Sequence, residues 1–156
     1  MSDITKQSLS ELVKNIKDKK ISSEEVTKAF IDRSEKSKEL NAYITEDYSS
    51  ALDKAKKFDQ KPNLDLKLPG IPMAVKDLFC TKDVRTTAGS KILDNFVPTY
   101  ESTVTQNIWD EGAILLGKLN CDEFAMGSSN ETSFFGNVQN PIDKNLVPGG
   151  SSGGSA

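Results

Sequence analysis

Residues 102–120 read STVTQNIWDEGAILLGKLN, and this stretch decides the fold class. Ser102 is a residue type that caps helices, and apolar residues follow it at helical spacing, namely Val104, Ile108 and Trp109. Gly112 ends that pattern. The next four residues, AILL at 113–116, form a short apolar run that is typical of a buried strand. We therefore expect a helix followed directly by a core strand.

A second apolar stretch precedes that helix in the chain, where residues 70–79 read GIPMAVKDLF. This run predicts another strand. The resulting order of strand, helix and strand indicates an α/β architecture. At 156 residues, one domain with a packed core is the default expectation.

Lys76 lies inside this second apolar stretch, although lysine is rarely fully buried without a purpose or a partner. Two interpretations are open. In an apolar interior, desolvation disfavours the charged form of a lysine, and the neutral amine can act as a general base. Alternatively, Lys76 pairs with Asp77 or extends its amine to the surface. Taken alone, the stretch favours this second interpretation.

The first 62 residues are rich in charge and predict helices. They contain 13 of the 20 Lys and Arg residues and 12 of the 23 Asp and Glu residues, with few glycines or prolines. We expect these helices to pack and to present partner surface rather than to carry chemistry. Residues 63–156 hold nearly all the Gly and Pro residues, and we expect the start of the sheet core and the loops there.

Two capping boxes mark helix starts in the first part of the chain. Ser8 with Glu11 starts one helical pattern, and Ser22 with Glu25 starts another that runs to about residue 38. A third helix is expected over 49–58. Residues 40–44 favour a short strand, and residues 121–126 a short helical segment.

Composition excludes several classes of function. The net charge of −3 disfavours an autonomous nucleic-acid binder, which normally shows a basic excess. The sequence has no histidine, so residues 1–156 hold neither a histidine-based triad nor a Cys/His zinc site. Cys80 and Cys121 lie far apart in the sequence and form no CxxC pair. This pattern indicates a reducing compartment, in which both act as small core residues. No stretch has transmembrane length, and we expect a soluble cytosolic protein without metal.

Two loops are rich in small polar residues. Residues 127–136 read GSSNETSFFG, and either contact a ligand or form an ordinary connection. Residues 148–156 read PGGSSGGSA, and a flexible linker or a functional loop both fit. A phosphate-binding loop is disfavoured, because the run lacks the lysine and the glycine spacing that such loops need.

The lysine of GIPMAVKD at 70–77 and the GGSSGGS run at 149–155, taken together, resemble the amidase signature family, in which a Ser-Ser-Lys triad replaces a histidine-based one. Within that family the chain is similar to the A-subunits of glutamyl-tRNA(Gln)/aspartyl-tRNA(Asn) amidotransferases. The similarity to these subunits rests on CTKDVRTT at 80–87, NFVP at 95–98, GKLN at 117–120 and DEFAMGSS at 122–129. A local departure is SNETS at 129–133, where the family usually reads STENS. The resemblance implies the N-terminal part of one amidase domain, with a mixed sheet flanked by helices.

The resemblance also implies roles for individual residues. Lys76 matches the catalytic base, and Ser151 matches the bridging serine, which follows a cis peptide bond in this family. Substrate-binding positions are matched by Met126, Gly127 and Ser128. Support of the loop is assigned to Gly149, Gly150, Ser152 and Ser155.

The nucleophilic serine of the family, its oxyanion hole and its glutamine-recognition residues lie further along than Ala156. We therefore expect residues 1–156 alone to be inactive, whereas the parent protein hydrolyses glutamine and supplies ammonia for Gln-tRNA or Asn-tRNA formation. The implied partners are the B and C subunits, with ATP, Mg²⁺ and tRNA bound by the complex. An organellar matrix is an alternative location, although no transit peptide is present. Two alternatives stay open: a stand-alone amidase acting on another amide, and a non-catalytic fragment that binds partners through its N-terminal helices.

Overall fold

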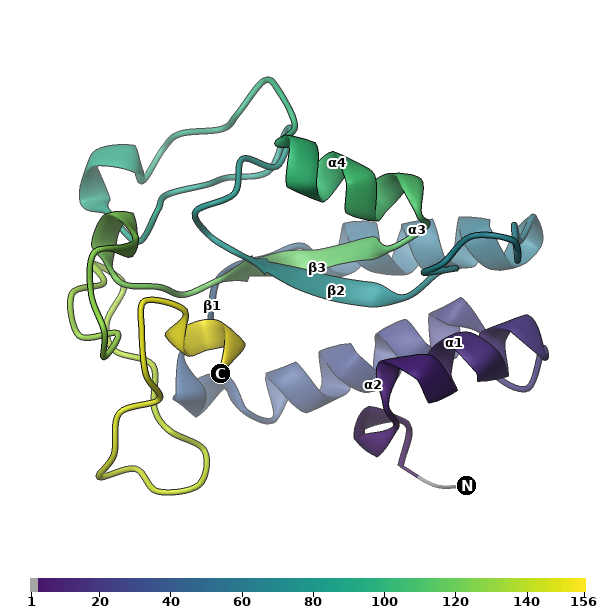
Figure 1. The fold of residues 1–156 in the computed structure, drawn as a ribbon, viewed down its shortest axis with the longest axis horizontal. Coiled ribbons are helices and arrows are strands. Elements are labelled where there is room, and N and C mark those ends of the chain that lie inside the picture. The colour runs from purple at the N-terminus through teal and green to yellow at the C-terminus, as the bar shows by residue number, and fades with distance from the viewer. Residues whose placement is uncertain (1–2) are drawn as a thin grey trace. The chain divides into compact units, whose positions relative to one another are not determined.

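The computed structural model describes residues 3–156, drawn as a ribbon in Figure 1. The α-helices are α1 (Leu9–Lys17), α2 (Ser23–Glu35), α3 (Tyr48–Gln60) and α4 (Thr103–Asp110), and the strands are β1 (Tyr43–Glu46), β2 (Pro72–Lys76) and β3 (Ile114–Leu119). Short 3-10 helices are η1 (Ile4–Lys6), η2 (Lys38–Leu40), η3 (Lys91–Leu93), η4 (Glu123–Ala125) and η5 (Gly153–Ser155).

The described chain divides into two compact units, each built from separate segments. The first extends to residue 36 and includes 47–73 and 106–116; the second comprises 37–46, 74–105 and 117–156. The boundaries follow neither the expected division at residue 62 nor any one linker. The assignment of all 156 residues to one domain stays a prediction.

Both predicted capping boxes are confirmed. The hydroxyl of Ser8 accepts from the Glu11 N–H at 3.3 Å, and the Glu11 carboxylate accepts from the Ser8 N–H at 2.8 Å. Ser22 and Glu25 repeat the pattern, at 3.1 Å and 2.8 Å. Each box satisfies two N–H groups that would otherwise lack a partner at the start of α1 and α2.

The core of the first unit lies where the apolar faces of α1 and α2 meet the residue before β2. Leu12 and Ile16 from α1, Val26 from α2 and Ile71 form the buried cluster. Burying side chains of this size stabilises a fold by about 1.5–3 kcal/mol each. The hydroxyl of Ser23 also donates to the Gly70 carbonyl at 2.6 Å, so α2 is tied to the start of β2 by a buried hydrogen bond.

The sheet has the strand order β1-β3-β2, with β3 in the middle. β1 pairs antiparallel with β3, with Thr45 opposite Lys118 and an irregularity between Tyr43 and Thr45. β2 runs parallel to β3, because the Ile114 N–H donates to Ile71 before β2 and the Asp77 N–H donates to Leu119 after it. The expected α/β class, with a mixed sheet flanked by helices, is therefore confirmed (Figure 1).

Several element boundaries differ from the sequence prediction. α2 ends at Glu35 and not near residue 38: the Lys36 N–H still bonds the Asp32 carbonyl in the helical pattern, but the chain then enters the 3-10 turn η2. The strand expected over 40–44 is β1, which begins at residue 43 because 38–40 form that turn. The run at 113–116 continues as a strand to Leu119 through its pairing with β1. The helical segment expected over 121–126 is only η4, interrupted by Phe124 at φ 52°.

Among residues 3–156, no helix combines the length and the apolar composition that a membrane crossing needs.

Candidate active site

The side chain of Lys76 meets the C-terminal Gly/Ser run within the second unit. Its Nζ lies 2.5 Å from Ser151 Oγ and 2.9 Å from Ser152 Oγ, and a lysine amine and a serine 75 positions apart are thus in hydrogen-bond contact. Lys76 is the last residue of β2 and is half-buried. The interpretation of the Gly/Ser run as a flexible linker is therefore wrong, because its hydroxyls are held against a strand residue.

The backbone of the Gly/Ser run rests on the segment that follows β3. The Asp122 N–H donates to the Ser151 carbonyl at 3.1 Å, and the Gly154 N–H donates to the Asn120 carbonyl at 2.9 Å. The peptide bond between Gly150 and Ser151 is cis, as the family resemblance implied. These contacts fix where the Ser151 hydroxyl lies.

Glycine is required at two positions in this run because the neighbouring segment approaches its backbone closely. A Cβ at Gly150 would lie 2.3 Å from the Asp122 carboxylate, and a Cβ at Gly153 would lie 2.2 Å from Asn130 Oδ1. No side chain fits at such distances without displacing buried groups. The predicted role of Gly150 in loop support stays a prediction.

Asp122 is the centre of the supporting segment. It is fully buried, and its carboxylate accepts from the Asn130 N–H at 3.0 Å, the Thr132 N–H at 3.2 Å and the Thr132 hydroxyl at 2.9 Å. Burial alone would raise the pKa of Asp122, but these hydrogen bonds outweigh it, so the pKa of this carboxyl lies below its usual value. The ionised side chain therefore holds residues 130–132 beneath the Gly/Ser run.

The expected substrate-binding residues lie in the segment that supports the Gly/Ser run. Gly127 packs against the Asp122 carboxylate, and the backbone after Ser128 lies close to Gly150. Met126 is 83% exposed. Ser152 contacts Lys76 directly, whereas Ser155 uses its backbone N–H to bond the Ser152 carbonyl. Their roles in substrate binding and loop support stay predictions.

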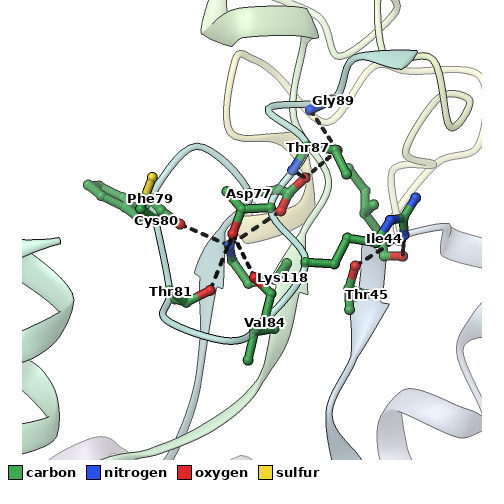
Figure 2. Close-up of polar contacts among 12 residues, drawn as sticks. Ile44, Thr45, Asp77, Phe79, Cys80, Thr81, Val84, Thr87, Gly89 and Lys118 are labelled. Atoms are coloured by element: carbon green, nitrogen blue, oxygen red, sulfur yellow. Dashed lines mark hydrogen bonds and ion pairs between the residues drawn. The ribbon is translucent and has the colours of Figure 1, made fainter. Parts of the chain in front are cut away.

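A fully buried lysine, Lys118, lies one strand away and was not predicted as a site residue. Lys118 on β3 is 0% exposed and forms an ion pair with Asp77 at 3.4 Å, as Figure 2 shows. Asp77 therefore pairs with Lys118, which makes the predicted alternative of a Lys76–Asp77 pair wrong. The available signal was the same as for Lys76: a lysine inside an apolar run, here ILLGKL.

The arrangement around Lys76 suits proton transfer between an amine and a hydroxyl. A general base must lie about 2.6–3.2 Å, between heavy atoms, from the group whose proton it takes, and the amine of Lys76 has one hydroxyl oxygen within that range and one just below it. An amine in contact with a serine hydroxyl is also how some serine hydrolases activate a nucleophile without histidine.

The chain belongs to the amidase family, which it matches over residues 25–156. It is 85% identical over its full length to the A-subunit of glutamyl-tRNA(Gln) amidotransferase from Pelagibacter ubique (strain HTCC1062), and covers 32% of that protein. Identity to the protein of the same name from Hyphomonas neptunium (strain ATCC 15444) is 53%, again over the full chain and 33% of the relative.

The chain is also similar to solved structures. The A-subunit of glutamyl-tRNA(Gln) amidotransferase from Thermotoga maritima superposes with a TM-score of 0.77 at 32% identity, over 99% of this chain and 32% of that one. The native peptide amidase from Stenotrophomonas maltophilia gives a TM-score of 0.85 at 28% identity, over 96% of this chain and 33% of that one. The chain thus spans about a third of the length of the relatives that it matches.

Proposed function

We propose that this chain supplies the base and the bridging serine of a Ser-Ser-Lys triad that hydrolyses the side-chain amide of glutamine. The observation that carries the proposal is the 2.5 Å contact between Lys76 Nζ and Ser151 Oγ. The identity of 85% to an amidotransferase A-subunit supports glutamine as the amide, in preference to a substrate of a stand-alone amidase.

The proposed proton path runs through Ser151. The neutral amine of Lys76 takes the proton of Ser151, which takes the proton of a nucleophilic serine located in the part of the relatives that this chain does not cover. That serine attacks the glutamine carboxamide and forms an ester, and the amide nitrogen leaves as ammonia with the proton returned along the same path. Water then hydrolyses the ester, so that glutamine and water give glutamate and ammonia.

The ammonia is proposed to serve a transamidation on tRNA. In this proposal the A-subunit protein works with B and C subunits, which convert Glu-tRNA(Gln) to Gln-tRNA(Gln), or Asp-tRNA(Asn) to Asn-tRNA(Asn), with ATP and Mg²⁺ bound by a partner. The absence of a basic excess in this chain agrees with tRNA binding elsewhere in the complex. Because the relatives described above are bacterial, the cytoplasm is the proposed location.

The test uses a chimera in which residues 1–156 replace the corresponding part of the Pelagibacter ubique relative. We expect the chimera to release ammonia from glutamine, and Lys76→Met and Ser151→Ala each to lower kcat/KM by about 10²–10⁴. The double variant should lose little more than either single one, because both residues act in one relay. Lys82→Met is the matched control, since it removes the same charge from an exposed position in the same unit.

Four outcomes would contradict the proposal in whole or in part. Full activity of Lys76→Met would refute the proposed triad. Additive losses in the double variant would refute the proposed proton relay. Turnover of other primary amides, without turnover of glutamine, would instead favour a stand-alone amidase. Failure of the chimera to form Gln-tRNA with B and C subunits, despite glutamine hydrolysis, would refute the amidotransferase part alone.

A further inference from the structure

Two lysines of the second unit lie on neighbouring strands, and their surroundings differ. Lys76 ends β2, is half-buried, and contacts the hydroxyls of Ser151 and Ser152. Lys118 on β3 is fully buried. A buried ammonium is costly unless acceptors surround it, so the contacts of Lys118 indicate what it does.

Lys118 faces three acceptors, one for each of its N–H groups. Its Nζ lies 2.6 Å from Thr86 Oγ1, 2.8 Å from the Phe79 carbonyl and 3.4 Å from the Asp77 carboxylate. Burial lowers the pKa of the Lys118 ammonium, and the Asp77 carboxylate opposes part of that shift. All three acceptors come from the segment directly after β2, so Lys118 ties that segment to β3 (Figure 2).

Asp77 follows Lys76 in the chain, yet its carboxylate is held in place by other groups. Its Oδ2 accepts from the N–H and the hydroxyl of Thr87, and its Oδ1 faces Lys118 (Figure 2). The backbone is also fixed, because the Asp77 N–H donates to Leu119 and its carbonyl accepts from Ala88. The negative charge beside Lys76 is therefore compensated by a different lysine.

We propose that Lys118 is a positioning residue which holds and neutralises the Asp77 carboxylate, so that Lys76 keeps hydroxyl partners and can work as a neutral base. This inference rests on the proposed function, because it explains how the base of that function is maintained. A carboxylate free to contact Lys76 would favour the ammonium form, which cannot accept a proton. Lys118 thus acts through Asp77 and does not touch the reacting atoms.

Other titratable groups in the same unit act on this pair. Cys121 follows β3 and lies close enough to Lys76, Asp77, Lys118 and Asp122 for its charge to interact with theirs. Cys80 and Glu101 face Lys118 from the segments after β2 and before α4. Each of them is unchanged in the variants below, so that differences among the variants report on the Asp77–Lys118 pair.

The test compares Lys118→Met, Asp77→Asn and the double variant. Lys118→Met leaves an uncompensated carboxylate, and should move the acidic limb of the kcat/KM profile of the chimera upward by about one pH unit. Asp77→Asn leaves an uncompensated ammonium and should move that limb downward. The double variant should return to within a few tenths of a unit of the starting protein. Lys82→Met should leave the profile in place.

A measurement that does not depend on catalytic activity separates the proposed function from the proposed role of Lys118. Trace acetylation of the chimera at a series of pH values, followed by peptide mass spectrometry, reports the midpoint at which the Lys76 amine becomes reactive. The same upward, downward and restored shifts are expected there. Shifts in the same direction for both single variants, or no shift, would overturn the role of Lys118. An inactive chimera with the expected labelling shifts would instead overturn the proposed function and leave the charge arrangement intact.

Discussion

Replacing Asp122 with asparagine should loosen the segment that supports Ser151. The carboxylate of Asp122 accepts three hydrogen bonds, two from Thr132 and one from the Asn130 N–H. Asparagine has nearly the same shape but only one acceptor oxygen. If that oxygen faces Thr132, its NH₂ group points at the buried N–H of Asn130, where two donors meet.

The magnitude follows from these contacts. A hydrogen bond to a charged group contributes about 1.5–3 kcal/mol, and a buried donor left without an acceptor costs about 1–3 kcal/mol. Asp122→Asn loses the hydrogen bond from the Asn130 N–H and leaves that N–H without an acceptor. It also weakens the two hydrogen bonds from Thr132, because the negative charge is removed. We expect a loss of about 3–5 kcal/mol in the local stability of residues 120–132 and 149–156.

Amide hydrogen exchange read by mass spectrometry measures this loss directly, because it reports the opening free energy of each segment. The matched control is Asp83→Asn, which removes the same charge from an exposed position in the same unit. A loss below about 1 kcal/mol in Asp122→Asn, or one equal to that of the control, would show that the carboxylate does not hold the loop.

Further variants and pH changes test the same region. The hydrogen bonds that lower the pKa of Asp122 stabilise the fold above about pH 4, and this stability is lost as the pH falls through the lowered value; Asp122→Asn should therefore flatten an acid unfolding curve below pH 4. Burial raises the pKa of Cys121 to about 11. The folded chain thus keeps a proton that the unfolded chain loses near pH 8.5, so stability should fall by about 3 kcal/mol between pH 8.5 and 11, and Cys121→Ala should remove the fall in urea titrations. At pH 8, iodoacetamide should label half-buried Cys80 well before Cys121. Gly150→Ala places a Cβ 2.3 Å from the Asp122 carboxylate, and we expect at least a 100-fold loss of kcat/KM in the chimera; activity within threefold of the starting protein would show that the loop adapts freely.

Local features of the fold could be predicted because they depend on neighbours in the chain. Each capping box needs only a serine and a glutamate three residues apart, and both form as expected. Boundaries that depend on distant partners were predicted less well. β3 continues to Leu119 because it pairs with β1, which lies about 70 residues earlier. No local pattern encodes that pairing.

The contact between Lys76 and Ser151 was expected from the family resemblance and not from spacing. Composition alone favoured a surface position for Lys76 and left a linker open for the Gly/Ser run. What decides against the linker is the set of groups beneath the run, Asp122, Asn120 and Asn130, which fix its backbone and exclude side chains at Gly150 and Gly153. These groups belong to a different segment, so the run alone could not reveal them.

Lys76 and Lys118 show why the more buried of two lysines could not be predicted from the sequence. Both lie in apolar runs, but β3 is the middle strand, and its burial pattern covers both faces from Ile114 to Lys118. Lys76 ends β2, a strand at the edge of the described sheet, where its amine reaches a loop that opens to solvent. Strand order is set by the whole chain and it assigns the buried, carboxylate-paired position to Lys118. The half-buried position with hydroxyl neighbours falls to Lys76. This difference between the two environments is the basis for proposing that Lys118 holds a carboxylate in place while Lys76 exchanges a proton.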